Sequence, residues 1–164
     1  MVAIYPLKQV IEVKQRRVDE AEKVVKEKEA ALQKEKDILV EKEKERDKVK
    51  QHYADKLAQL RHEMDVSTTS PKIQQMKVYL NVAKEKIVIE EKKVEDQKKQ
   101  VEAAEKNLEN AKNELKIKRQ EVDKLMTHRK DWIKEMRKEE EIVEARDQDE
   151  MGSIIFTTHH QKKR

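Results

Sequence analysis

The feature that most constrains the fold of this chain is an apolar residue at every seventh position between residues 73 and 122. The row consists of Ile73, Leu80, Ile87, Val94, Val101, Leu108, Leu115 and Val122. A strict heptad repeat drifts around a straight α-helix, so it stays on one face only when the helix supercoils around another helix. The repeat therefore predicts a coiled coil, which needs a second helix as its partner.

A second heptad row lies in the first part of the chain. It consists of Ile4, Ile11, Val18, Val25, Leu32, Leu39, Arg46, Tyr53 and Leu60. Between the two rows, Ser70 followed by Pro71 is typical of a helix N-terminus. Two long helices joined by a short connection run antiparallel. We therefore predict an all-α fold, a single long antiparallel two-helix coiled-coil hairpin that forms one domain.

The expected boundaries follow from these patterns. We place the first long helix at residues 5–65, the turn at 66–70 and the longer second helix at 71–148. Residues 149–164 contain the chain's one glycine and are expected to form a mobile tail. The chain is 45% charged and 35% hydrophobic, whereas globular domains are about a quarter charged and about half apolar. Such a composition can fill a narrow seam between helices but not a broad core.

A turn centred on Thr68 sets the expected register. Leu60 then faces Met76, and Arg46 faces Glu90, which has the opposite charge. In the middle of the hairpin, charged residues face apolar ones in the pairs Lys42–Val94, Glu35–Val101 and Lys28–Leu108. We expect thinner packing and easier local opening there, because charged heads stay in water while their stems lie along the seam. The residues chosen to represent the seam are Leu32, Arg46, Leu60, Ile73, Leu80, Ile87, Glu90, Leu108, Leu115 and Val122.

The sequence offers little support for catalysis, a cofactor or a metal. The chain has no cysteine and a single glycine, which leaves no thiolate chemistry and no glycine-rich phosphate loop. His159 and His160 could bind a metal weakly, although adjacent histidines in a mobile tail have no fixed geometry. No apolar run approaches the ~20 residues that cross a bilayer, and no signal-peptide pattern is recognised. We expect neither enzymatic activity nor membrane insertion.

Charge is interspersed along the whole chain, with 39 basic and 35 acidic residues. Such a pattern is typical of a solvated helix surface. A nucleic-acid-binding coiled-coil arm is a less favoured alternative, because acidic residues interrupt nearly every basic run and would oppose phosphate contacts.

The open end of the hairpin is the main candidate for binding a partner. Apolar, aromatic and basic residues gather there, and Trp132 is the only tryptophan; aromatic residues and Arg often anchor interfaces. The candidates are Leu7, Ile11, Lys14, Arg16, Arg17, Lys118, Arg119, Arg129, Lys130, Trp132, Met136 and Arg137. A structural alternative is that Trp132 only covers Ile4 and Tyr5 at the end of the hairpin. Beyond this end, Ile142, Val143 and the run 154–156 have no expected partner within the chain.

The chain opens with a segment that contains Pro6, Leu7, Val10, Ile11, Lys14, Arg16, Arg17, Val18, Ala21, Glu22 and Val25. With these residues the segment resembles the opening helix of the YscO-type stalk proteins of type III secretion, whose flagellar counterparts are the FliJ proteins. The expected topology, a hairpin with a longer second helix, agrees with that family over the whole chain. The resemblance implies a coiled coil like that of the rotary-ATPase γ subunit.

The same resemblance implies a function and partners. The family suggests a non-enzymatic central stalk in the cytoplasm, peripheral to the secretion apparatus, that inserts one hairpin end into the hexameric secretion ATPase. It also implies links to the export-gate protein and to secretion chaperones. Without the resemblance, the residues support a coiled-coil spacer or scaffold with interaction sites at its ends. We expect a monomer when the protein is free, because the seam is satisfied within one chain.

Overall fold

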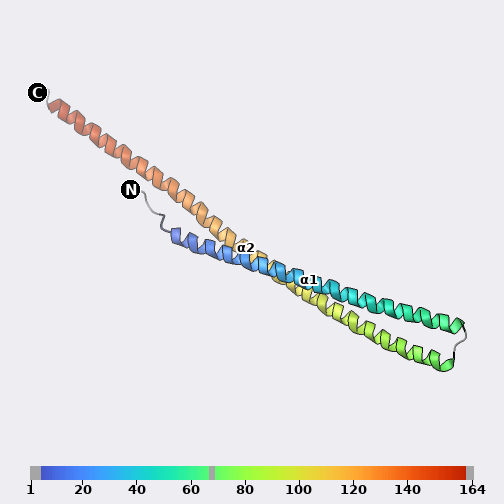
Figure 1. Cartoon of the computed structure of the whole chain (residues 1–164). Coiled ribbons are helices and arrows are strands. Elements are labelled where there is room, and N and C mark those ends of the chain that lie inside the picture. The colour runs from blue at the N-terminus through green and yellow to red at the C-terminus, as the bar shows by residue number, and fades with distance from the viewer. Residues whose placement is uncertain (1–4, 67–68, 162–164) are drawn as a thin grey trace. The chain divides into compact units, whose positions relative to one another are not determined.

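The computed structural model describes residues 5–66 and 69–161, and the side chains of residues 160 and 161 are not described. Two helices make up the fold: α1, Lys8–Asp65, and α2, Ser70–Gln161 (Figure 1). Within the described ranges no residue lies in a β-strand. The predicted all-α class and the pair of long helices are therefore confirmed.

At the start of each helix, N–H groups donate to the carbonyl of a residue that precedes the helix. The backbone N–H of Lys8 donates to the carbonyl of Tyr5 at 3.2 Å, so Pro6 lies in the turn that leads into α1. At α2, the N–H groups of Lys72 and Ile73 donate to the carbonyl of Thr69 at 3.1 and 3.3 Å. Pro71 consequently occupies the first turn of α2, where a missing N–H costs no helical hydrogen bond. The expected turn centre, Thr68, lies outside the described residues.

The chain divides into two compact units, and α1 and α2 each contribute to both. The hairpin unit comprises residues 22–113 and contains the connection between the helices. Its helices run antiparallel (Figure 1). Five of its buried residues come from the predicted rows: Val25, Leu60, Leu80, Val94 and Val101. The other three, Ala83, Gln97 and Ala111, each lie three positions after a residue of the α2 row.

The terminal unit comprises residues 5–21 and 114–161 of the described chain. Its buried residues are Tyr5, Val18, Ala21, Leu115 and Val122. Leu7, in the turn before α1, and Ile11 of α1 are half-buried, as are residues 118, 125 and 132 of α2. Each unit thus has one narrow seam, as expected for a chain with this little apolar surface.

The expected thin packing at Lys42–Val94 and Glu35–Val101 differs from the structure. Val94 is only 3% exposed and Val101 is 8% exposed. Lys42 donates from Nζ to the side-chain oxygen of Gln97 at 2.9 Å, so its aliphatic stem crosses the seam rather than leaving it. Of the three charged residues, Lys28 alone is exposed.

The facing charges Arg46 and Glu90 also differ from the expected pair. The Arg46 guanidinium donates to Asp47 at 2.8 and 2.9 Å, and Glu90 accepts from Lys93 at 2.7 Å. These bonds raise the pKa of Arg46 and of Lys93. Each charge therefore has its partner on its own helix, although the side chains of Arg46 and Glu90 are only 23 and 16% exposed. Glu90 Oε2 is buried without a hydrogen bond, which leaves the seam imperfectly satisfied at this layer.

Helix α2 extends further than the expected end near residue 148. It continues through Gly152 to Gln161. The hydroxyl groups of Thr157 and Thr158 donate to the backbone carbonyls of Ser153 and Ile154, each at 2.9 Å. Such hydrogen bonds to the preceding turn are compatible with a helix. The mobility expected for this segment stays a prediction. Over their described residues, neither α1 nor α2 has a stretch long and apolar enough to span a membrane.

Candidate partner-binding site

An aromatic cluster lies in the terminal unit, where the chain enters α1. Tyr5 is 5% exposed, and its ring meets that of Trp132 edge-on, with centroids 5.4 Å apart and planes at 63°. The Tyr5 hydroxyl and His128 Nδ1 are hydrogen-bonded at 2.7 Å. Trp132 and His128 are four residues apart on one face of α2, so both side chains can contact Tyr5. We call Tyr5, His128 and Trp132 the aromatic clasp.

The aromatic clasp was only partly foreseen from the sequence. Trp132 was expected to face Ile4, which lies outside the described residues, with Tyr5 as a further neighbour. His128 was not expected to take part. A signal was present, because His128 and Trp132 have the i, i+4 spacing that brings two side chains onto one helix face.

A shallow groove of about 300 Å³ opens beside the clasp. It is lined by Tyr5, Arg129, Trp132, Ile133, Met136, Arg137 and Glu140. Its lining combines aromatic and aliphatic side chains with two arginines and one glutamate. Such a groove suits a side chain with an apolar body and an anionic end, the combination that Arg and aromatic residues commonly bind at interfaces.

One ion pair crosses between the helices in this unit. Lys14 Nζ donates to Glu121 Oε2 at 2.6 Å. That hydrogen bond, together with the charge of Lys14, lowers the pKa of Glu121. The candidate residue Lys14 is therefore already engaged with α2, and it contributes to the site chiefly by holding the helices in register.

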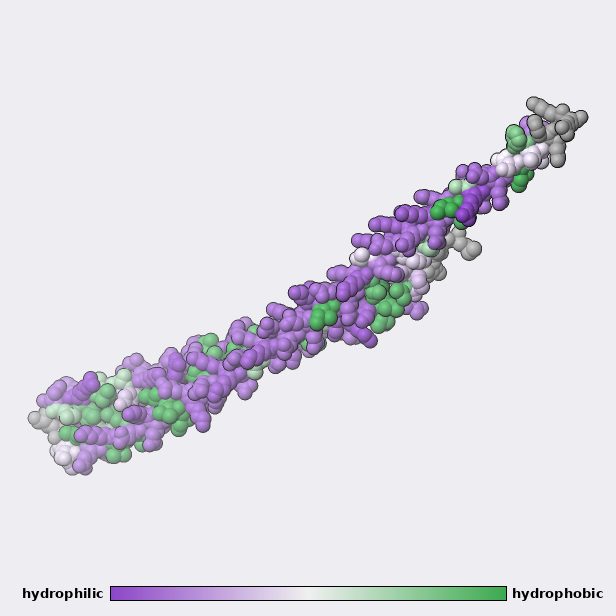
Figure 2. Space-filling model, turned by 180° about the vertical axis from the view of Figure 1, so that it is seen from behind, coloured by the Kyte–Doolittle hydropathy of each residue, from purple (hydrophilic) through white to green (hydrophobic). Residues whose placement is uncertain are grey.

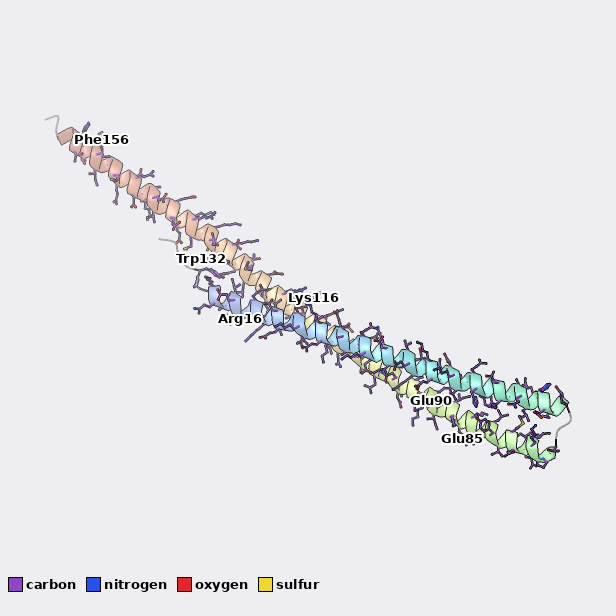
Figure 3. All side chains as sticks on the ribbon, viewed as in Figure 1. Arg16, Glu85, Glu90, Lys116, Trp132 and Phe156 are labelled. Carbon is purple, nitrogen blue, oxygen red and sulfur yellow. The ribbon has the colours of Figure 1, made fainter. Side chains whose placement is uncertain are left out.

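The remaining basic candidates are distributed along the same terminal unit, and most of them are exposed. Arg16, Arg17, Arg119, Arg129, Lys130 and Arg137 are exposed, and Lys118 is half-buried. Arg16 extends from α1, and Trp132 lies on α2 near the start of α1 (Figure 3). We call these seven residues the basic collar. Leu7, Ile11, Trp132 and Met136 are half-buried, so they add apolar surface beneath it.

The charge reverses along α2 directly after the collar. Between residues 129 and 138 five basic residues accompany two acidic ones, whereas residues 139–150 contain seven carboxylates and one arginine. Residues 137–159 are all exposed, and Phe156 extends from this part of α2 (Figure 3). We call residues 139–161 the overhang. More than half of the residue surface is exposed at Ile142, Val143, Met151, Ile154, Ile155 and Phe156, which gives the overhang an apolar component.

The site offers binding chemistry. On the face shown in Figure 2, polar side chains dominate and apolar ones form separate patches among them. Among residues 5–66 and 69–161, no group of three or more His, Asp or Glu side chains is arranged to hold a metal ion. What the terminal unit does present is a set of exposed basic side chains, an aromatic clasp and a groove.

Comparison with known proteins adds a family relationship. A family model described as YscO-like protein matches residues 2–162. A solved structure described as a YscO homolog, CT670, from Chlamydia trachomatis is 47% identical, covers 98% of this chain and 99% of that chain, and has a TM-score of 0.93. A chain in the structure of the Chlamydia pneumoniae CdsV and CdsO protein complex is 48% identical over 51% of this chain and 98% of that chain, with a TM-score of 0.49. No curated protein sequence matches the chain.

Proposed function

The chain belongs to the YscO-like family of type III secretion proteins, and on that premise we propose that it is a non-enzymatic stalk of the secretion ATPase. Its terminal unit enters the pore of the hexameric ATPase ring, as the γ subunit does in rotary ATPases. The rest of the chain links the ring to the export-gate protein and receives secretion chaperones. The protein acts in the cytoplasm, peripheral to the secretion apparatus.

The basic collar is the observation that carries this proposal. Six of its seven residues are exposed, so they are available to a partner. Basic side chains on a narrow shaft fit a pore that is lined by acidic side chains. Contacts between exposed charges are individually weak and re-form readily, which suits a shaft that meets successive subunits of a ring.

The acidic overhang limits how far the shaft can enter such a pore. Carboxylates at residues 139–150 are repelled by an acidic lining, whereas the collar is attracted to it. The most favourable position therefore places the collar within the lining and the overhang beyond it. On this proposal, the charge reversal after Lys138 sets the depth of insertion.

A second exposed surface suits the export gate. Val78, Val82 and Ile89 of α2 are 63, 45 and 54% exposed. Their spacings of four and seven residues place them on one face of the helix. Exposed apolar residues aligned in this way commonly mark protein interaction sites. We assign this face of the hairpin unit to the export-gate protein, and its test is a binding assay with Val78→Ser and Ile89→Ser.

The decisive experiment for the stalk measures binding of the purified secretion ATPase and its rate of ATP hydrolysis. The full chain should bind, promote hexamers and stimulate hydrolysis, with an affinity that falls as salt screens the collar. Arg16→Glu, Arg17→Glu and Arg129→Glu together should abolish binding.

The matched control carries Lys26→Glu, Lys44→Glu and Lys92→Glu, which alter net charge equally at exposed positions of the hairpin unit. The control should bind as the natural chain does. Equal loss in both variants would mean that net charge, rather than the collar, governs binding. Absence of binding by the folded natural chain would refute the stalk and leave the spacer or chaperone adaptor.

A further inference from the structure

Four ion pairs cross the seam of the hairpin unit along one edge. They are Glu29–Lys112 at 3.2 Å, Lys36–Glu105 at 3.1 Å, Glu43–Lys98 at 3.9 Å and Lys50–Glu91 at 2.7 Å. Successive members on each helix are one heptad apart, so all four pairs occupy the same position of the repeat. We call these four pairs the charge ladder.

The sign of the charge alternates from one rung of the ladder to the next. Along α1 the order is Glu, Lys, Glu, Lys, and α2 presents the complementary order. If α2 slipped by one heptad, Glu29 would meet Glu105. The other encounters would also join like charges: Lys36 with Lys98, Glu43 with Glu91 and Lys50 with Lys84.

The apolar seam by itself does not exclude such a slip. The row from Ile73 to Val122 repeats every seven residues, so a shift by one heptad returns an apolar residue to nearly every layer. Most side chains of the rungs are about half exposed. Ion pairs that are this exposed add little to stability. They contribute instead to the difference in free energy between the native and the slipped alignment.

We propose that the charge ladder is a register lock that prevents α1 and α2 from sliding past one another. A rung that changes from attraction to like-charge repulsion shifts the slip equilibrium by about fourfold. Four rungs then disfavour the slipped state by on the order of 200-fold. A hairpin under an axial or twisting load keeps its length and alignment because of this lock.

Gln97 adds a contact with the same period. It is 5% exposed, and its amide nitrogen donates to the backbone carbonyl of Glu35 at 3.2 Å and to the Glu35 carboxylate. Its oxygen accepts from Lys42 at 2.9 Å. Glu35 and Lys42 are one heptad apart on α1. The buried amide of Gln97 therefore lies between them and is hydrogen-bonded to both. A test of the ladder therefore uses chains carrying Gln97→Leu, which leaves the ladder as the polar device under study.

The critical variant makes the ladder uniform in sign. Lys36→Glu, Lys50→Glu, Glu91→Lys and Glu105→Lys keep an opposite-charge pair at every rung and leave the net charge unchanged. A control inverts both members of all four rungs, so it has eight substitutions and preserves the alternation. Both variants should keep nearly the natural helicity and melting temperature, because Lys and Glu have similar helix propensities.

Register is read by cysteine cross-linking, since the natural chain contains no cysteine. Ile38→Cys with Lys93→Cys reports the native alignment, because these positions lie two heptads from the bonded pair His52–Tyr79. Ile38→Cys with Lys86→Cys reports the slipped alignment.

We expect the uniform ladder to increase slipped cross-linking by about tenfold or more, as the loss of a ~200-fold discrimination allows. The inverted ladder should stay within about fourfold of the natural level, because only its Lys50→Glu side chain would meet an opposite charge, Lys84, after the slip. The native cross-link, measured in every variant, verifies that the hairpin is folded. A uniform ladder that shows no slipped cross-linking would refute the lock, because the connection between the helices and the other contacts across the seam, such as Lys14–Glu121, would then suffice to set the register. Equal slipping in the inverted ladder would refute it as well.

Discussion

Replacing Trp132 by alanine separates the structural role of the aromatic clasp from binding. The edge-on contact with Tyr5 has a centroid separation of 5.4 Å, within the range where aromatic pairs contribute about 0.5–1.5 kcal/mol beyond area burial. Loss of the indole also frees the Tyr5 hydroxyl from its fixed alignment with His128, which is a further ~0.5–1 kcal/mol. The first turn of α1 should thus open more easily by about 2 kcal/mol in total, or roughly 30-fold.

Amide hydrogen exchange at Lys8 and Ile11, whose N–H groups donate to the carbonyls of Tyr5 and Leu7, measures that opening directly. The expected result is about 30-fold weaker protection there, with helicity by circular dichroism nearly unchanged, because Val18 and the buried residues after it are untouched. Phe156→Ala is the matched control, since it also removes an aromatic ring but one that is 69% exposed. If Trp132→Ala weakens binding to the ATPase ring as well as the amide protection, the clasp positions the collar. Collapse of overall helicity in Trp132→Ala would refute the local account.

Four other changes have outcomes that follow from the structure. Leu80→Ala empties a buried seam position and should lower the free energy of unfolding by about 2–3 kcal/mol in urea titrations. Gln97→Leu should leave the melting temperature equal or higher, because a buried polar group is replaced by an apolar one of similar size. The pair Lys14–Glu121 lowers the pKa of Glu121, so its contribution is present above the ordinary glutamate pKa of about 4.3 and lost as pH falls through the lowered value; Glu121→Gln should be less stable than the natural chain at pH 7 but not at pH 2. Gly152→Ala meets nothing within 4 Å and should increase helicity of the overhang by NMR shifts, in line with about 0.5–1 kcal/mol.

The heptad rows alone were enough to predict the two helices and their partnership. They depend on the period of apolar residues and on Ser70–Pro71, both local properties of the chain. The role of the candidate residues in binding a ring or an export gate stays a prediction. The end of α2 was misjudged, because one glycine costs a helix only about 1 kcal/mol and the threonine hydroxyls after it bond back to the helix.

Partner choice among charged residues was decided by the tertiary structure. Arg46 and Glu90 were expected to meet, yet each is bonded to a neighbour on its own helix. Long charged side chains have many partners within reach, and the one selected depends on local exposure that a heptad position does not contain. The same holds for Tyr5, whose burial against His128 and Trp132 requires the three-dimensional approach of residues 123 positions apart.

The sequence by itself thus determined the helices and the composition of the seam, because apolar periodicity is written residue by residue. The structure decided how charge is arranged across the seam: the clasp, the buried amide of Gln97 and the alternating rungs from Glu29 to Lys50. Apolar packing with a seven-residue period is nearly the same after a shift of one heptad, so it cannot choose among alignments. Paired charges and buried hydrogen bonds can, because each is favourable only when one particular partner lies opposite.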